Sequence, residues 1–419
     1  MNKEVKITAH DRAILRELGQ RLMEHAHDPI MEERRRLWRK HASLQGERPM
    51  ILAETSGVVD EVMPLSALRC QEPWARQLER GLRLQLFQVE EVRDDWVLEP
   101  WLNVRWKVDL GNYGVTVEHN RADNEGKLGS YKVDPPIKDL QRDWEKLHPR
   151  VPTVDREGTL AWKATLEELF AGILPVRIRG SYWWTMGMTI VAIDLIGLDN
   201  LMLWMYDDPD GLHRLMAFLR DDHLHITQWC EREGLLTLNN ENDYVGSGGI
   251  GYTTELPQPD WREGQPVRLK DLWGLSESQE TVGVSPEMFA EFIMPYQKPV
   301  IEQFGLSYYG CCEPVHSRWH VIAQLSNLRS VSISPWCDQA FMAEALGRRY
   351  IFCRKPNPAI ISRQVWDEEE IRQDLRYTLT VAKHCEVEFA MKDVHTLMDQ
   401  PQRLGRWVEI AREEIARLW

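Results

Sequence analysis

From residue 175 onward, short strand-like runs alternate with amphipathic helical segments. The runs are rich in β-branched and aromatic residues, and they cover residues 176–184, 235–242, 306–312, 330–334, 350–354 and 386–392. Repeated strand–helix units predict a parallel sheet with helices on its faces. Because the strands are short, their series is long and a helix ends the chain, we expect a closed (β/α)8 barrel, a TIM barrel, rather than an open doubly wound sheet.

The first part of the chain has a different pattern. Residues 7–45 show helical periodicity, whereas residues 96–120 read as extended segments around a Gly-Asn turn. We therefore predict an N-terminal α+β extension over residues 1–170, packed on a barrel over residues 171–419. No G-x-G-x-x-G turn follows any predicted strand, which counts against a dinucleotide cofactor.

Composition excludes several classes of protein. The chain has 419 residues and a formal net charge of −14, and it has no run of five basic residues, so nucleic-acid or membrane binding is not expected. No apolar stretch approaches the roughly 18 residues of a membrane span, and the start lacks the apolar core of a signal peptide. Seven cysteines are an odd and sparse set, which favours free thiols in a reducing cytoplasm.

Polar or thiol groups follow five consecutive predicted strands whose bodies are apolar. Active sites of β/α barrels lie at the carboxyl ends of the strands, so these groups define the predicted site. The candidates for catalysis are Glu241, Cys312, Asp393 and His395. The candidates for substrate binding are Tyr182, Trp183, Asn239, Tyr244, Trp336 and Lys392.

Two of these groups indicate a specific chemistry. Asp393 and His395 share one face of an extended segment, and such a pair can place a general acid or base near neutral pH. A plainer interpretation is that Thr396 or Asp399 caps the final helix without His395. Aromatic rings at the rim suit a methoxyaromatic ring or a quaternary amine, although each tryptophan could equally belong to the core.

Residues 244–283 form an insert rich in Gly and Pro between two predicted elements. Structureless loops longer than about 12–15 residues are usually functional lids or disordered. The Trp, Tyr and Leu content of this insert favours a lid over the mouth of the barrel.

Four stretches stand in a recognisable order along the barrel. They are YDDPDGLHRLMAFLRDDHLHITQWCEREG (206–234), VSPEMFAEFIMPYQKPVIEQFGL (284–306), a strand that ends in cysteine, and KPNPAII (355–361). Together they resemble the uroporphyrinogen decarboxylase superfamily. The resemblance implies a (β/α)8 barrel that either decarboxylates tetrapyrroles or moves methyl groups to or from corrinoid proteins or coenzyme M.

The methyltransferase branch of that superfamily is the closer match. The decarboxylases carry an R-Q-A-G-R motif, which this acidic chain lacks. The coenzyme M branch holds zinc with a His-x-Cys pair and a later cysteine, but no histidine stands two residues before Cys311 or Cys312, and Met391 occupies the last strand. A substitute zinc set of Cys312, His316 and Cys353 is conceivable, with Glu241 as an oxygen ligand. Because strand neighbours alternate faces, at most one of the paired cysteines is expected to be a ligand.

Three hypotheses follow. The first is a methyltransferase that moves a methyl group from a small methoxyaromatic or methylamine-like donor to the corrinoid of a separate partner protein. The second is a decarboxylase that clamps carboxylates with Arg177, Arg179, Arg354 and Lys355. The third is a non-catalytic binding subunit on the same barrel. The barrel could also form a homodimer.

Overall fold

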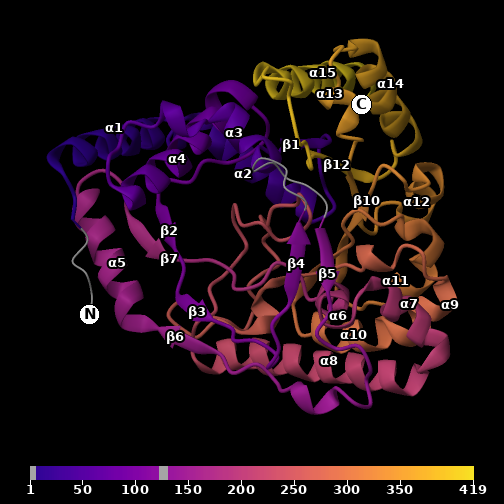
Figure 1. Cartoon of the computed structure of the whole chain (residues 1–419). Coiled ribbons are helices and arrows are strands. Elements are labelled where there is room, and N and C mark those ends of the chain that lie inside the picture. Colours follow the sequence, from indigo (N-terminus) through magenta and orange to yellow (C-terminus); the bar gives the residue numbers. More distant parts are fainter. Residues whose placement is uncertain (1–5, 122–130) are drawn as a thin grey trace.

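The centre of the molecule is a six-stranded parallel sheet (Figure 1). The computed structural model describes residues 6–121 and 131–419. Strand order across the sheet is β1-β12-β11-β10-β9-β8. The bounds are β1 Met50–Ala53, β8 Trp273–Ser276, β9 Leu306–Tyr309, β10 Leu328–Ile333, β11 Ile351–Arg354 and β12 Glu386–Met391.

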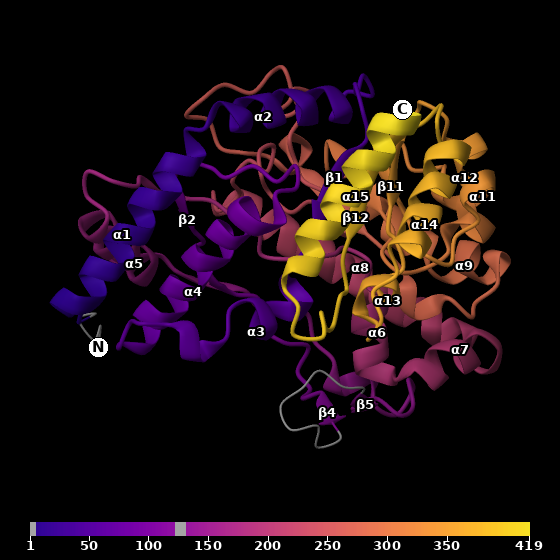
Figure 2. The ribbon, with the colours of Figure 1, turned by 90° about the horizontal axis from the view of Figure 1, so that it is seen from above.

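Helices cover the outer face of this sheet. They pack their apolar sides on outward-facing strand residues such as Ile51, Val331 and Phe389 in one large buried cluster. Figure 2 shows α14 and α15 side by side over this part of the sheet. The helices of this part are α6 Thr189–Ile196, α7 Leu198–Asp207, α8 Pro209–Arg232, α9 Pro286–Phe292, α10 Met294–Ile301, α11 Trp319–Ile322, α12 Gln339–Leu346, α13 Ala359–Ser362, α14 Glu368–Val381 and α15 Gln402–Leu418.

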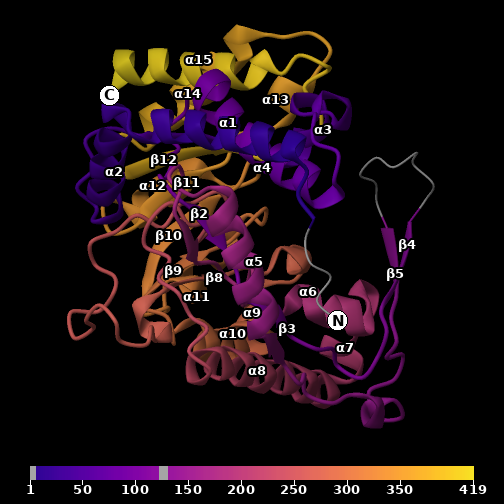
Figure 3. The same cartoon turned by 90° about the vertical axis from the view of Figure 1, so that its left-hand side faces the viewer.

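The N-terminal part adds helices and three small two-stranded sheets. Its helices are α1 Ala9–Ala26, α2 Pro29–Ala42, α3 Val59–Val62, α4 Pro73–Phe87 and α5 Arg156–Leu169. The small sheets pair β2 Leu102–Val104 with β7 Val176–Ile178, β3 Lys107–Asp109 with β6 Thr153–Asp155, and β4 Glu118–Arg121 with β5 Tyr131–Asp134. Figure 3 shows the β4–β5 hairpin beside α6 and α7. Residues 1–5 and 122–130 of the predicted extension lie outside the described residues.

The prediction of a closed eight-stranded barrel is not confirmed, because the described strands form no closed sheet. Side chains, together with backbone groups outside strands, form the hydrogen bonds at both edges of the six-stranded sheet: the N–H of Asp95 donates to the Ile51 carbonyl at 2.9 Å, and that of Met186 to the Leu275 carbonyl at 2.7 Å. The backbone N–H groups of Ile51 and Ala53 in β1 donate to Asp95 and Asp94, each at 2.9 Å. At the other edge, the side-chain amide of Asn239 donates to the carbonyl of Trp273 at 3.0 Å and accepts from its N–H at 2.9 Å. Edge strands whose backbone groups are paired in this way need no neighbouring strand.

The run predicted at 306–312 is a strand only over Leu306–Tyr309, and two other predicted strands are also shorter or absent. The run at 176–184 is a strand only over Val176–Ile178. Residues 235–242 are not a strand, since Thr237 and Asn239 bond to their neighbours through side chains.

A glycine-rich segment lies against the inner face of the sheet. A side chain at Gly246 would come within 2.2 Å of the Tyr308 ring, and one at Gly248 within 2.7 Å of the Ala390 side chain. These residues belong to the insert predicted as a lid. Only glycine allows the backbone to approach the strands so closely.

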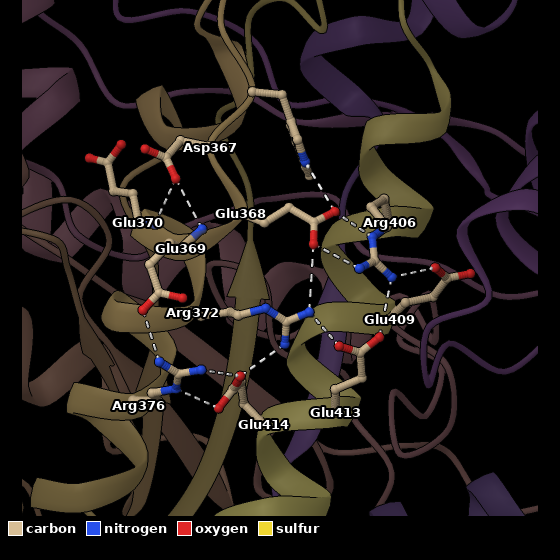
Figure 4. A network of polar contacts seen from close by, with 11 residues as sticks. Asp367, Glu368, Glu369, Glu370, Arg372, Arg376, Arg406, Glu409, Glu413 and Glu414 are labelled. Atoms are coloured by element: carbon tan, nitrogen blue, oxygen red, sulfur yellow. Dashed lines mark hydrogen bonds and ion pairs between the residues drawn. The ribbon is translucent and has the colours of Figure 1, made fainter.

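The outside of the molecule carries a network of ion pairs between α14 and α15 (Figure 4). Glu414 is buried and pairs with both Arg372 and Arg376, at 2.9 and 2.8 Å. Arg406 pairs with Glu368 at 2.7 Å and with Glu409 at 3.1 Å. The network fixes the two helices against each other.

The described part of the chain contains no single helix that is long and apolar enough to cross a membrane. Only α6 and α7 together pass that test of length and composition, and they meet at 91°.

Candidate functional site

Functional groups gather where the six strands end. Glu54, Glu277, Cys311, Lys355 and Lys392 lie at or just beyond the carboxyl ends of β1, β8, β9, β11 and β12. Because all six strands are parallel, these ends share one rim of the sheet. A polar or thiol residue follows directly, or after one glycine, where each of these five strands ends.

Two neighbouring thiols occupy the rim after β9. Gly310 has φ +99° and turns the chain out of the strand, so the cysteines no longer alternate faces. The sulfur atoms of Cys311 and Cys312 lie 3.6 Å apart. Cys312 also lies 3.7 Å from Asp393 Oδ2. The expected opposition of the two side chains is wrong, because the strand ends before them at Tyr309.

A buried serine connects the thiols with a lysine. Ser247 donates to Cys311 Sγ at 3.1 Å and accepts from Lys392 Nζ at 2.8 Å. A hydrogen bond from Cys312 lowers the pKa of Cys311 to about 7, although burial opposes this, and the charges of Lys392 and Lys355 add to the effect. For Lys392, burial alone would lower the pKa, but Tyr244 and Glu54 outweigh it and raise the pKa.

Four predicted substrate-binding residues line one cavity. Tyr182, Trp183, Asn239 and Tyr244 face a volume of about 400 Å³, together with Trp184 and Trp273. The cavity therefore has aromatic walls, as a small aromatic or cationic ligand would need. The Tyr182 hydroxyl is already used, since it donates to the carbonyl of Leu235 at 2.5 Å.

Tyr244 also borders a second cavity, of about 390 Å³, which contains two carboxyl groups. Burial raises the pKa of Glu54, and it raises the pKa of Asp94 to about 7. Oε1 of Glu54 is buried, and no hydrogen-bond partner for it exists among the described residues. Burial and the nearby carboxylate of Glu54 raise the pKa of Tyr244 as well. Tyr244 thus separates the aromatic cavity from the cavity that contains Glu54, and its hydroxyl accepts from the backbone N–H of Gly248 at 2.9 Å.

A third cavity lies on the other side of the rim. It measures about 480 Å³, and Cys312, Trp336 and Glu280 are among the residues that line it. Trp336 is thus separated from the other predicted aromatic residues. Burial raises the pKa of Glu280, and it raises that of the neighbouring Glu277 further.

Two predicted catalytic residues lie apart from these cavities. The carboxylate of Glu241 pairs with Arg177 at 2.6 Å and with Arg179 at 3.3 Å, which holds it as a charged partner rather than a free acid. His395 is exposed beyond β12, two residues from Asp393.

The predicted zinc ligands do not converge. Cys353 is fully buried in a cluster with Tyr308 and Ala390, and Nδ1 of His316 accepts from the backbone N–H of Asp338 at 3.2 Å. Nowhere in residues 6–121 and 131–419 do three His, Cys, Asp or Glu side chains meet in a group that could hold a metal ion. The donor set present does not fit zinc.

The predicted carboxylate clamp does not assemble either. Its cations are engaged with groups of the protein itself: Arg177 with Glu241, Arg179 with Asp243, Arg354 with Asp374, and Lys355 with the Tyr308 hydroxyl.

Sequence reasoning missed Glu54, Asp94 and Ser247. Glu54 follows a strand of only four residues, which no local periodicity reveals. Ser247 stands in the glycine-rich insert, where the sole signal was the pattern Gly-Ser-Gly-Gly.

Comparisons with known proteins bear on the fold. No family model and no curated protein matches the chain. Among solved structures, a methyltransferase from Methanosarcina mazei aligns with 90% of this chain and 97% of its own, with 13% identity and a TM-score of 0.50. At this identity, the likeness shows a shared fold alone.

Proposed function

We propose that this protein is a methyltransferase that takes a methyl group from a small methoxyaromatic or methylamine-like donor. The observation that carries the proposal is the aromatic cavity, which shares the wall residue Tyr244 with a second cavity that contains the buried carboxyl group of Glu54. The fold shared with a methyltransferase supports the same reading. The acceptor is the corrinoid of a separate partner protein, which supplies a strongly nucleophilic cobalt when bound.

The aromatic walls hold and orient the donor. Trp183 and Trp273 lie on different segments of the cavity wall, so a flat ring or a quaternary amine can be held between rings. Holding the methyl carbon toward the rim provides the alignment that a bimolecular displacement requires.

Tyr244 and Glu54 supply the proton that the leaving oxygen needs. When the methyl carbon of an ether leaves, the electron pair of the C–O bond stays on oxygen, and that oxygen must take a proton. The Tyr244 hydroxyl donates it from the cavity wall, and the carboxyl group of Glu54 returns a proton to Tyr244. Burial raises the pKa of both groups, which is the direction that favours a general acid.

Cys312 and Asp393 belong to the open side of the rim, and the partner protein approaches from there. Asp393 is exposed and Cys312 lines the cavity beside Trp336. Lys392 supports this side through Ser247. No step in this scheme requires a zinc ion.

The test is an anaerobic assay with added cob(I)alamin and a panel of methoxyaromatic compounds and quaternary amines. The cobalt spectrum should change with at least one donor, and Trp183→Ala should raise the KM for it. Trp336→Ala, a tryptophan substitution at the other cavity, should leave that KM unchanged. The proposal fails if no donor yields methyl transfer while uroporphyrinogen is decarboxylated.

A further inference from the structure

The paired thiols after β9 differ in their access to solvent. Cys312 is the most exposed of the seven cysteines, and the other six are buried. It lines the cavity of about 480 Å³ beside Trp336, which is open to small molecules. Cys311 lies behind it, with 4% of its surface exposed.

The buried partner sits in surroundings that favour a thiolate. Ser247 donates to its sulfur at 3.1 Å, and Lys392 lies one hydrogen bond further, 2.8 Å from the Ser247 hydroxyl. A second lysine, Lys355, is buried nearby and bonds to Ser332, whose hydroxyl donates to the Cys311 carbonyl at 2.6 Å. Neighbouring cations and hydrogen-bond donors are what make a cysteine reactive.

The two sulfur atoms also face each other. They lie 3.6 Å apart, so the sulfur atoms must approach each other by about 1.5 Å to reach the bonding distance of about 2.05 Å. The proposed methyl transfer gives Cys311 no role, and the lack of a fitting metal group among the described residues leaves its position unexplained.

We propose that Cys311 and Cys312 form a thiol–disulfide exchange site that takes small disulfides through the cavity beside Trp336. The hydrogen bond to Cys311 and burial raise the pKa of Cys312, so this thiol needs a base. Cys312 passes its proton to the Cys311 thiolate, whose sulfur lies 3.6 Å away, and attacks the incoming disulfide, which forms a mixed disulfide and releases one thiolate. The released thiolate takes that proton from Cys311 and leaves as a thiol. The Cys311 thiolate then attacks the Cys312 sulfur, which closes a Cys311–Cys312 disulfide and releases the second thiol. In total the protein gives up two protons and two electrons, and the small disulfide is reduced to two thiols.

The Cys311–Cys312 disulfide is easily reduced again. Bridged cysteines usually have Cα atoms about 4.4–6.8 Å apart, whereas adjacent residues are held at about 3.8 Å. Strained disulfides have higher reduction potentials and belong to the labile class. The site therefore exchanges with a thiol pool rather than locking the fold. Closure also draws Cys312 away from Asp393, which changes the open side of the rim.

The test treats the folded full-length protein with glutathione disulfide and follows intact mass and peptide maps. The wild type should lose two hydrogen atoms, with both cysteines in one linked peptide, and dithiothreitol should restore them. Cys311→Ser should instead keep a stable glutathione adduct on Cys312, because the resolving thiol is missing. Cys312→Ser should gain no adduct.

Cys337→Ser is the matched control, since this buried cysteine also follows a strand at the same rim, and it should behave as the wild type. A stable glutathione adduct on Cys312 in the wild type would overturn the proposal, and so would an unmodified wild type. The wild-type result decides the question even if a variant folds poorly. It does not depend on the methyl-transfer assay.

Discussion

The outer and inner faces of the central sheet differ in how many partners their polar groups have. Outside, the charges of α14 and α15 pair with one another (Figure 4), and the buried Arg354 of β11 pairs with Asp374 of α14 at 2.9 Å among apolar residues such as Val331 and Phe389. Inside and at the rim, single polar groups such as Lys355, Lys392 and Ser247 are buried among few partners. One buried oxygen of Glu54 has no hydrogen-bond partner among the described residues. On our proposal, the inner face holds the titratable groups used in chemistry, whereas the outer face contributes mainly to stability.

The largest expected effect belongs to the inner face. Tyr244→Phe should lower the rate of methyl transfer from a methoxyaromatic donor by about 10²–10⁴-fold, because the leaving oxygen loses its general acid. A quaternary amine leaves as a neutral amine and needs no proton, so its rate should change little. The measurement is the rate of cob(I)alamin methylation in a single turnover with each donor, under anaerobic conditions that prevent oxidation of the cobalt.

Tyr182→Phe is the matched control, since that hydroxyl already donates to Leu235. An equal loss of rate for both donors in Tyr244→Phe would assign Tyr244 to binding rather than to proton transfer.

A buried ion triad joins the N-terminal part to the sheet and predicts a pH effect. His41 lies between Glu386 and Glu388, at 2.8 and 3.0 Å. Burial opposes its charge, but these hydrogen bonds raise the pKa of His41 to about 9. The folded state thus binds the proton more tightly than the unfolded state, whose pKa is about 6.5. This contribution to stability is full below pH 6.5 and is lost as pH rises through about 9.

Urea unfolding between about pH 6 and 10 should show a loss of roughly 3 kcal/mol from this group. His41→Gln should be less stable at the acid end and should have a flatter pH dependence. His384→Gln, whose ring bonds only to the Ala343 carbonyl, serves as control. If the free energies of unfolding of the wild type and of His41→Gln change with pH in parallel, His41 does not carry the raised pKa described here.

The glycine-rich segment offers a steric test of the inner face. A methyl group at Gly246 would lie 2.2 Å from the Tyr308 ring, so Gly246→Ala should lower the free energy of unfolding by about 1–3 kcal/mol. Gly81→Ala is the control, because a side chain there meets nothing within 4 Å and the residue lies within α4. It should stabilise the protein by up to about 1 kcal/mol. Equal stabilities of the two variants would show that the segment does not pack on the strand.

The smallest effect is expected on the outer face. Arg406 is partly exposed, and its partners Glu368 and Glu409 are exposed to a similar or greater degree. Exposed ion pairs contribute about 0–1 kcal/mol, so Arg406→Ala should change the free energy of unfolding by less than about 1 kcal/mol. A loss above roughly 2 kcal/mol would mean that the surface network supports the fold more than its exposure indicates.

Much of the outer layer could be predicted from the sequence, because apolar periodicity is a local signal. It located β9, β10, β11 and β12 and the helices between them. The edges could not be predicted, since they depend on contacts between distant residues: Asp95 caps β1, and Asn239 caps β8. Local patterns also could not show that β1 pairs with β12.

The site was predicted in part for the same reason. Strand ends marked Tyr182, Trp183, Asn239 and Tyr244, which line one cavity, although their role in binding stays a prediction. Glu241 has the right residue type at the end of a predicted strand, but an arginine 64 positions away neutralises it. The conformation of Gly310 then decides how the two cysteines lie, and a pattern of alternation assumes a strand that has already ended.

The position of a bound donor tests the central claim most directly. A crystal structure of the protein with a methoxyaromatic compound should place the ring among Tyr182, Trp183 and Trp273, with the ether oxygen within hydrogen-bonding distance of the Tyr244 hydroxyl. A ring bound in the cavity beside Cys312 and Trp336, or an ether oxygen turned away from Tyr244, would contradict the account.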